Sequence, residues 1–201
     1  MVAVRRVLIP CCVGALLAFG LTGILAATAA PGEGGQEEPK PGSRAFVLGD
    51  GLIVPGQRIG PVRLTMSIDQ ILTFVGTRPK RDEFPQDGII LYEWRTEGLW
   101  VSQTIATKAI RVISVFGTSD KYHTDKGVTL LAKRAKMESA YGKGYKEYEY
   151  SEDRITLIRY YDLGLQFGIV NQASNPTIHN RVFQIGIFKP GDLPLLRKPT
   201  R

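Results

Sequence analysis

The chain has 201 residues, of which 43% are hydrophobic and 22% are charged. This balance is typical of a folded protein and excludes a chain that is disordered throughout, while the length allows one ordinary domain or two small ones. The formal net charge of +7 is a moderate excess, which suits weak attraction to anionic surfaces or to an acidic partner protein.

The beginning of the chain has the order of a secretory signal peptide. Two arginines are the only charged residues among the first 32, and an apolar stretch runs from Val7 to Ala26 before an Ala-Thr-Ala sequence that ends at Ala29. A basic start, an apolar middle and small residues at the cleavage site are the parts that such signals share. We predict export, periplasmic or secreted, with cleavage near Ala29. An uncleaved membrane anchor is the alternative.

Export limits what the remaining chain can do. Both cysteines, Cys11 and Cys12, lie in the predicted signal, so the mature chain has no disulfide, cysteine nucleophile or cysteine metal ligand. Loss of the two arginines lowers the formal net charge from +7 to +5. We expect no nucleic-acid partner, and no stable membrane span after cleavage.

Similar segments recur along the mature chain. Val62–Leu64 has a counterpart 66 residues later in Val128–Leu130, and Gly98–Val101 has one at the same offset in Gly164–Phe167. A constant offset between separate segments is the signature of an internal repeat. The predicted organisation is a signal peptide (1–29), a flexible Gly/Pro-rich linker (30–45), a first unit (46–122), a second unit (123–190) and a C-terminal tail (191–201).

Each unit is predicted to begin with a helix. Ser67 and Gln70 form a capping box, in which each side chain meets a free backbone N–H of the other residue, and Gly76 supplies the left-handed stop. The second helix, over about 131–141, has Lys133 where the first has Ser67 and so lacks a good N-cap. Apolar strands follow each helix. We therefore predict an α+β fold of two tandem units, each a helix followed by a three-stranded antiparallel meander, with the helices packed on one face of the sheet.

Alternation along one predicted strand identifies candidate binding residues. Leu99 and Val101 share the core face, so Trp100, Ser102 and Thr104 share the other. A large aromatic residue on an open sheet face is a good anchor for a partner protein or a glycan. A segment that covers this face would instead make Trp100 a structural residue, and the sequence leaves both interpretations open.

The run from Ile59 to Ser67 (Ile-Gly-Pro-Val-Arg-Leu-Thr-Met-Ser), followed by a helix, Gly76–Pro79 and three strands, resembles a unit of exported bacterial proteins. It is similar to the units of the beta-lactamase inhibitor protein and of the small outer-membrane assembly lipoproteins, over about residues 52–190. The resemblance implies helices against an antiparallel sheet and a role in protein binding. The chain departs from the pattern at Thr65, where glycine is common, and has no lipid-attachment cysteine after the signal.

Residues with catalytic or metal-binding chemistry are few. The two histidines, His123 and His179, lie in polar stretches, whereas a metal site needs three or four supported ligands. No Gly-x-Ser-x-Gly or Ser-x-x-Lys motif occurs. One carboxylate cluster comprises Glu147, Glu149, Glu152 and Asp153. Its alternating Lys-Glu-Tyr sequence is typical of a solvated edge strand. We expect no metal and no cofactor, and predict that the protein is not an enzyme.

Basic residues gather on and around the second predicted helix, among them Lys133, Arg134 and Lys136. They form either a patch for an anionic partner or the solvated side of an amphipathic helix. We predict a binding module that recognises another exported or envelope protein, or an anionic envelope component, through the open face of its sheet. Trp100 would be the anchor and the basic helix would steer the partner. The alternatives are a glycan- or cell-wall-binding module, and a hydrolase with an unrecognised site.

Overall fold

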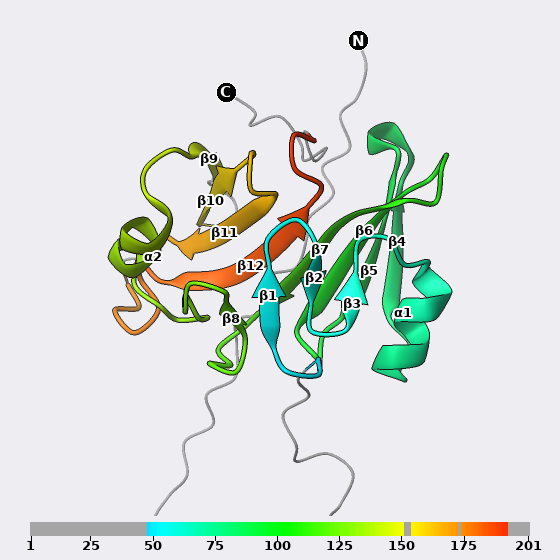
Figure 1. Ribbon diagram of the computed structural model, residues 1–201, viewed down its shortest axis with the longest axis horizontal. Coiled ribbons are helices and arrows are strands. Elements are labelled where there is room, and N and C mark those ends of the chain that lie inside the picture. Colours follow the sequence, from blue (N-terminus) through cyan, green and yellow to red (C-terminus); the bar gives the residue numbers. More distant parts are fainter. Residues whose placement is uncertain (1–47, 151–153, 173, 193–201) are drawn as a thin grey trace, which may run out of the picture. The chain divides into compact units, whose positions relative to one another are not determined.

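Residues 48–150, 154–172 and 174–192 are described from a computed structural model of the chain (Figure 1). They belong to one compact unit, built of an eight-stranded sheet, a four-stranded sheet and two α-helices of eight residues each. Neither of these helices has the length and apolar character needed to cross a bilayer. The predicted signal peptide, the linker and most of the predicted tail lie outside the described residues.

The large sheet is antiparallel, with the spatial order β4-β5-β6-β7-β12-β11-β10-β9. Its first four strands along the chain are β4 (Lys80–Phe84), β5 (Ile89–Trp94), β6 (Leu99–Thr104) and β7 (Ile110–Phe116). The last four are β9 (Lys146–Tyr150), β10 (Ile155–Tyr160), β11 (Leu165–Val170) and β12 (Val182–Phe188). Each run of four pairs in sequence, and the runs meet where β7 pairs with β12. This leaves β4 and β9 as the two edges.

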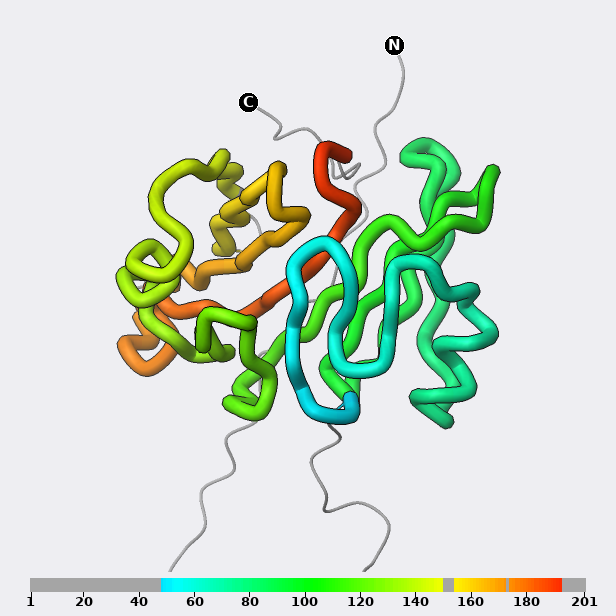
Figure 2. Tube along the Cα trace, viewed as in Figure 1, coloured from blue at the N-terminus to red at the C-terminus, as the bar shows by residue number. Residues whose placement is uncertain are grey.

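The small sheet has the order β3-β2-β1-β8. It comprises β1 (Leu52–Val54), β2 (Arg58–Ile59), β3 (Val62–Arg63) and β8 (His123–Thr124). The pairing of β1 with β8 is parallel, and that of β1 with β2 is antiparallel. In Figures 1 and 2 the small sheet lies in front of the middle of the large sheet, with α1 toward one side and α2 toward the other.

Helix α1 (Ile68–Val75) begins and ends where the local sequence predicts. The Ser67 hydroxyl accepts a hydrogen bond from the Gln70 backbone, the Gln70 side chain accepts one from the Ser67 N–H, and Gly76 has a left-handed φ of 75°. The predicted capping box and glycine stop are therefore confirmed. Both signals act over a few residues, which is why the sequence alone predicts them.

Helix α2 (Arg134–Tyr141) begins later than predicted. Lys133 is its N-cap and makes no side-chain capping hydrogen bond, as expected for a lysine at this position. Leu131 has a left-handed φ of 60°, and its N–H donates to the carbonyl of Val182. The residues before α2 are thus held by the start of β12, a distant contact that local helix propensity does not include.

One hydrophobic core lies between the small sheet and helices on one side and the large sheet on the other. The small sheet contributes Ile53 and Ile59, α1 contributes Ile71, and α2 contributes Met137. These residues cluster with buried side chains of the large sheet such as Phe167. Both helices and the small sheet therefore cover the same face of the large sheet.

The predicted α+β class is wrong. The described residues are mostly β, with two sheets in a sandwich-like arrangement and two short helices. The predicted pair of helix-plus-meander units is also wrong, because β8 from the predicted second unit pairs with β1 from the first. Each meander has four strands rather than three. Strand β4 was missed because its sequence, Lys-Arg-Asp-Glu-Phe, shows no alternation of apolar and polar residues. Only a strand with one buried face needs that alternation.

Both edge strands carry many charges. In β4, Lys80, Arg81 and Glu83 are exposed. In β9, Lys146, Glu147 and Glu149 are exposed. Each strand carries charges of both signs, and residues two apart in β4 form ion pairs, Lys80 with Asp82 and Arg81 with Glu83.

Candidate functional site

One row of side chains crosses all eight strands of the large sheet. Directly paired residues on neighbouring strands project to the same face, so the row follows from the pairing register. From β4 to β9 it consists of Lys80, Glu93, Trp100, Ser114, Gly186, Gln166, Arg159 and Lys146. We call the side of the sheet that carries this row the polar face.

Two further rows belong to the polar face because they lie two residues along each strand from the first. One consists of Tyr148, Leu157, Gly168, Gln184 and Phe116. The other consists of Asp82, Leu91, Ser102, Val112 and Phe188. The sequence neighbours of these residues, such as Leu99, Val101 and Phe167, belong to the hydrophobic core. The polar face is thus the side of the large sheet opposite α1, α2 and the small sheet.

Polar groups are buried in the middle of this face. Ser114 and Gln166 are each 2% exposed, and Arg159 is 4% exposed. Four buried atoms have no hydrogen-bond partner within the described part of the chain: Nε and Nη2 of Arg159, Oε1 of Gln166 and Nε1 of Trp100. An unsatisfied buried group costs about 1–3 kcal/mol, and more when it is charged, so native proteins keep few of them.

Aromatic side chains stand around these polar groups. The rings of Trp100 and Phe116 have centroids 4.5 Å apart. At the other end of the row, the Arg159 guanidinium lies 5.1 Å from the centroid of the Tyr148 ring, a cation–π contact. The Tyr148 and Tyr161 hydroxyls are 2.7 Å apart, and the Tyr161 ring contacts Phe188 edge-on. The face therefore offers apolar contact area on both sides of its polar middle.

The charge near Tyr161 changes the acidity of its phenol. Burial by itself raises the pKa of Tyr161. The hydrogen bonds with Tyr148 and Arg159 and the positive charges of Arg159 and Lys146 act in the opposite direction, and the net pKa lies below that of an ordinary tyrosine. The Nζ atom of Lys146 lies 5.7 Å from the centroid of the Tyr161 ring. This end of the polar face is therefore electropositive.

The structure separates the predicted binding residues into two groups. Trp100 and Ser102 lie on the polar face and are half-buried. Thr104 is at the end of β6, where its hydroxyl contacts that of Thr107 and accepts a hydrogen bond from the Ala109 backbone. Lys133, Arg134 and Lys136 are on or next to α2, which packs on the opposite face of the sheet. The two groups do not form one site.

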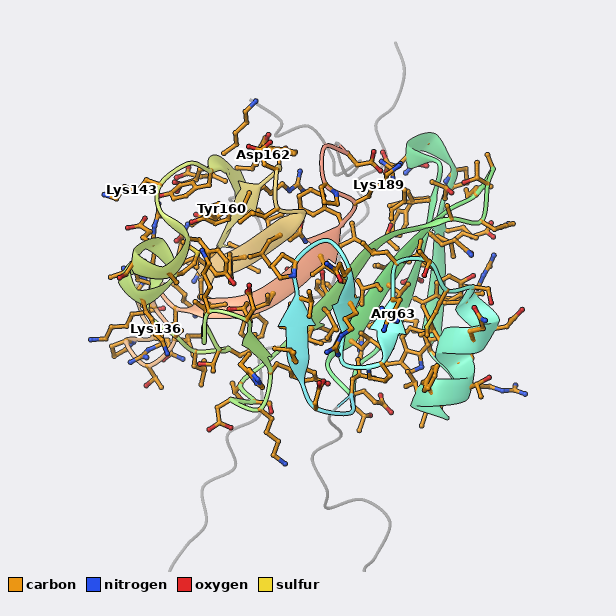
Figure 3. The ribbon with its side chains drawn as sticks, viewed as in Figure 1. Arg63, Lys136, Lys143, Tyr160, Asp162 and Lys189 are labelled. Atoms are coloured by element: carbon orange, nitrogen blue, oxygen red, sulfur yellow. The ribbon has the colours of Figure 1, made fainter. Side chains whose placement is uncertain are left out.

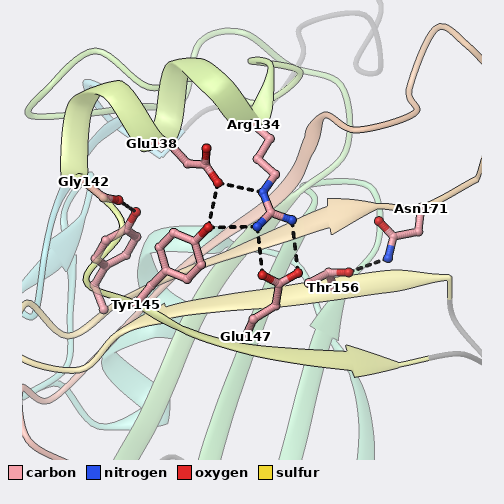
Figure 4. A network of polar contacts seen from close by, with 8 residues as sticks. Arg134, Glu138, Gly142, Tyr145, Glu147, Thr156 and Asn171 are labelled. Carbon is pink, nitrogen blue, oxygen red and sulfur yellow. Dashed lines mark hydrogen bonds and ion pairs between the residues drawn. The ribbon is translucent and has the colours of Figure 1, made fainter.

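Arg134 has internal partners (Figure 4). Its guanidinium pairs with both carboxylate oxygens of Glu147, at 3.1 and 2.8 Å, and its Nε donates to Glu138 at 2.9 Å. Tyr145 also accepts from Arg134 and donates to Glu138. These contacts, with that to Glu147 the largest, raise the pKa of Arg134 against the effect of burial. Its charge is thus balanced within the protein.

The other two basic residues of this group are exposed. Lys133 and Lys136 both reach the surface, and Figure 3 shows Lys136 and Lys143 at the outside of the molecule near α2. They are available for long-range attraction of an anion, but neither adjoins the polar face. The predicted role of the basic helix in steering stays a prediction.

The remaining candidates for chemistry are dispersed. His123 lies in β8, and His179 lies in the turn before β12. No group of three or more His, Cys, Asp or Glu side chains suited to a metal occurs in the described residues. Glu147 pairs with Arg134, and Glu149 is exposed on the edge strand. Glu152 and Asp153 lie outside the described residues.

Sequence reasoning missed the residues at the centre of the polar face, namely Ser114, Arg159, Gln166 and Gly186. One signal was available: Arg159 stands in the otherwise largely apolar strand Ile-Thr-Leu-Ile-Arg-Tyr. A charged residue in such a strand is buried only with a partner or a function. Its alignment with Gln166 and with Trp100 depends on the register of five strands, which the sequence does not provide.

Comparison of the sequence with protein-family models and with curated proteins gives no match. Solved structures similar to the fold include the uncharacterized protein yfeY from Escherichia coli, at 12% identity and a TM-score of 0.48, covering 68% of this chain and 99% of that one. A cysteine-rich secretory protein from Staphylococcus aureus has 11% identity and a TM-score of 0.43, covering 72% of this chain and 50% of that one. An extracellular protein containing a SCP domain from Bacillus anthracis has 7% identity and a TM-score of 0.41, covering 64% and 44%. The chain spans about half the length of the last two proteins. The resemblance to the beta-lactamase inhibitor protein and the outer-membrane assembly lipoproteins stays a prediction.

Proposed function

We propose that this chain is an exported, non-enzymatic binding module that recognises another exported or envelope protein through the polar face. One observation carries the proposal: Arg159, Gln166 and Trp100 hold buried polar atoms on this face without a hydrogen-bond partner among the described residues. A bound protein supplies the missing partners, and the aromatic residues around them supply apolar contact.

The composition of the central row supports binding rather than catalysis. Ser114 has the one hydroxyl among Trp100, Ser114, Gly186, Gln166 and Arg159, and its paired neighbours are Trp100 and Gly186. A serine nucleophile needs a base within hydrogen-bond reach, and neither neighbour is a base. The Arg159 guanidinium carries hydrogen-bond donors and no acceptor, so it cannot fill that role. The row offers donors, an acceptor and aromatic surface, which are the elements of recognition.

Export is part of the proposal and rests on the sequence. The predicted cleavage site near Ala29 lies outside the described residues. The mass and the N-terminal sequence of the protein recovered from its own cells would test it. A mature chain that begins near residue 30 supports export, whereas an intact N-terminus in the cytoplasm contradicts it.

Site-specific photo-crosslinking tests the proposed binding face. A photoreactive amino acid at Ser102 places the probe at the rim of the polar face. The matched control replaces Ser139, an exposed serine on α2, which covers the opposite face. Each variant is expressed in the protein's own cells and irradiated there, and the products are identified by mass spectrometry.

We expect one exported protein to crosslink from position 102 and not from position 139, and the crosslink to be lost with Trp100→Ala. The same crosslinks from both positions would contradict a specific face. Wall or glycan fragments in place of a protein would favour the alternative of a glycan-binding module.

A further inference from the structure

We propose that the polar face binds an extended acidic segment of the partner protein, with a ligand carboxylate at Arg159 and an apolar side chain at Trp100. This inference rests on the function proposed above and names the chemistry that the partner presents.

The carboxylate follows from which atoms of Arg159 lack partners. Nε and Nη2 form one edge of the guanidinium, and both are buried without a hydrogen bond. Two parallel N–H groups on one edge match the two oxygens of a carboxylate, which is the strongest common pairing of arginine. The Tyr148 ring lies over the guanidinium without using these donors. A buried cation whose donors lack partners calls for a negative charge.

Gln166 indicates that the ligand also brings a donor. It pairs directly with Arg159 on the neighbouring strand, and its Oε1 is buried without a partner. An acceptor next to the carboxylate position needs an N–H or O–H, and the backbone of a polypeptide provides an N–H at every residue except proline. Arg159 and Gln166 together are thus complementary to an acidic residue and its adjacent peptide group.

The order of the row sets the direction and length of the ligand. Trp100 and Arg159 are four strands apart, which corresponds to about 19 Å at the usual spacing of strands. An extended peptide covers this distance with about six residues. Ser114 and Gly186 lie between the two ends. A peptide that crosses the strands above this packed middle would place its apolar side chain at the Trp100–Phe116 ring pair.

A polypeptide fits these atoms better than a neutral glycan. Aromatic rings suit either ligand, but a neutral sugar has no charge for Arg159, and burying that charge without a counter-ion is costly. A chain of uronic acids carries carboxylates and is therefore included in the test as a separate probe.

The test measures the binding of short labelled peptides to the mature chain, residues 30–201, by fluorescence polarisation. The probe is a six-residue capped peptide with phenylalanine at the first position, glutamate at the last, and alternating serine and threonine between. One control peptide has glutamine in place of glutamate, and another has only two residues between the ends. Oligogalacturonate is the uronic-acid probe. We expect the glutamate peptide to bind about tenfold or more tightly than either control peptide.

Gln166→Glu is the decisive protein variant, because it places an internal carboxylate beside Arg159. We expect it to raise the melting temperature of the protein and to weaken the binding of the glutamate peptide at least about tenfold. Arg159→Gln should weaken the binding of the glutamate peptide and leave the binding of the glutamine peptide unchanged. Arg63→Gln, at an exposed arginine of β3 in the small sheet, which covers the opposite face, is the control and should change neither property.

Several results overturn the inference. Equal affinity for the glutamate and glutamine peptides, or peptide binding unaffected by Gln166→Glu, would contradict the placement of a ligand carboxylate at Arg159. Preferential binding of oligogalacturonate would assign the site to an acidic glycan. Tighter peptide binding after Glu37→Gln and Glu38→Gln would make the chain's own linker the occupant of the site. If these results occur while the crosslink from position 102 persists, only this inference fails; if that crosslink is also absent, the proposed function fails with it.

Discussion

Gln166 on β11 lies directly opposite Gly186 on β12, and its side chain occupies the space that a side chain at position 186 would need. A β-carbon at 186 would lie 2.9 Å from Gln166 Nε2 and 2.4 Å from Ser114 Oγ. Gly186 has ordinary strand geometry, so it is required for space and not for backbone conformation. The close packing of Ser114 and Gln166 over one glycine fixes the middle of the polar face.

Gly186→Ala should therefore destabilise the protein by about 1–3 kcal/mol, since overpacking forces neighbouring side chains from their positions. The measurement is the free energy of unfolding from urea denaturation. Gly144→Ala is the matched control, because a β-carbon there meets nothing within 4 Å, and it should stay within about 0.5 kcal/mol of the parent. Ser114→Ala combined with Gly186→Ala should recover part of the loss. A Gly186 variant as stable as the Gly144 variant would show that the face is loosely packed.

Gly164 should tolerate alanine far less well than Gly76, although both have left-handed backbone angles, with φ of 65° and 75°. A β-carbon at 164 would lie 2.1 Å from the backbone carbonyl oxygen of Phe188, whereas one at 76 meets nothing within 4 Å. Gly76→Ala should cost about 1–2 kcal/mol of backbone strain. Gly164→Ala adds a backbone clash and should cost more than about 4 kcal/mol. Thermal unfolding followed by circular dichroism compares the two, and similar melting temperatures would contradict the prediction.

Arg134→Lys should weaken the network around α2 by about 1 kcal/mol, because a lysine cannot pair with Glu147 through two parallel donors while also reaching Glu138. The Glu147 side chain is 37% exposed, so the effect should shrink at high salt. Urea unfolding at low and high salt measures this. Lys136→Gln changes an exposed charge on the same helix and should be neutral. Equal stabilities for the two variants would show that the network contributes nothing.

Two tyrosines should affect alkaline stability in opposite directions. Burial, together with the nearby Tyr145 and Glu138, raises the pKa of Tyr160 to about 12. An unfolded tyrosine ionises near pH 10, so the contribution of neutral Tyr160 is present below about pH 10 and is lost as the pH rises toward 12. Tyr160→Phe should remove that part of the loss of folding stability at alkaline pH. At neutral pH it should cost about 1 kcal/mol, through the lost 2.7 Å hydrogen bond to the Gly142 carbonyl.

Tyr161 has a lowered pKa, so the sign of its contribution reverses. Its ionised form is favoured in the folded protein, and the resulting stability is present above about pH 10 and lost as the pH falls. Tyr161→Phe should therefore make the loss of folding stability at alkaline pH steeper. Melting temperatures of both variants between pH 7 and 11 test the pair. Identical pH profiles for the two variants would contradict the assigned directions.

Local features of this fold could be predicted from the sequence, and distant pairings could not. The cap at Ser67 and the stop at Gly76 depend on neighbouring residues, and the alternation of Leu99 and Trp100 correctly separates the two faces of β6. The start of α2 was misplaced because Leu131 bonds to Val182, 51 residues away. The fold class was wrong because short strands such as β2 and charged strands such as β4 have weak patterns.

The candidate site was predictable only in part. Trp100 and Ser102 were identified from alternation in a single strand. Arg159 and Gln166 belong to strands that the sequence predicts only as apolar segments after the second helix, and their alignment with Trp100 passes through the β7–β12 pairing. That pairing joins segments about 70 residues apart through side-chain packing and backbone hydrogen bonds, for which no local sequence signal exists.

The charged edges of the large sheet govern how copies of this protein meet. Within the described part of the chain the large sheet ends at β4 and β9, and the unpaired backbone groups of such an edge can seed the growth of a fibril. To add to β4 or β9, an incoming strand would have to desolvate exposed lysines, arginine and glutamates. Crowding should therefore not drive edge-to-edge joining of the sheets, and the broad face, rather than the edges, is left to make contact with other molecules.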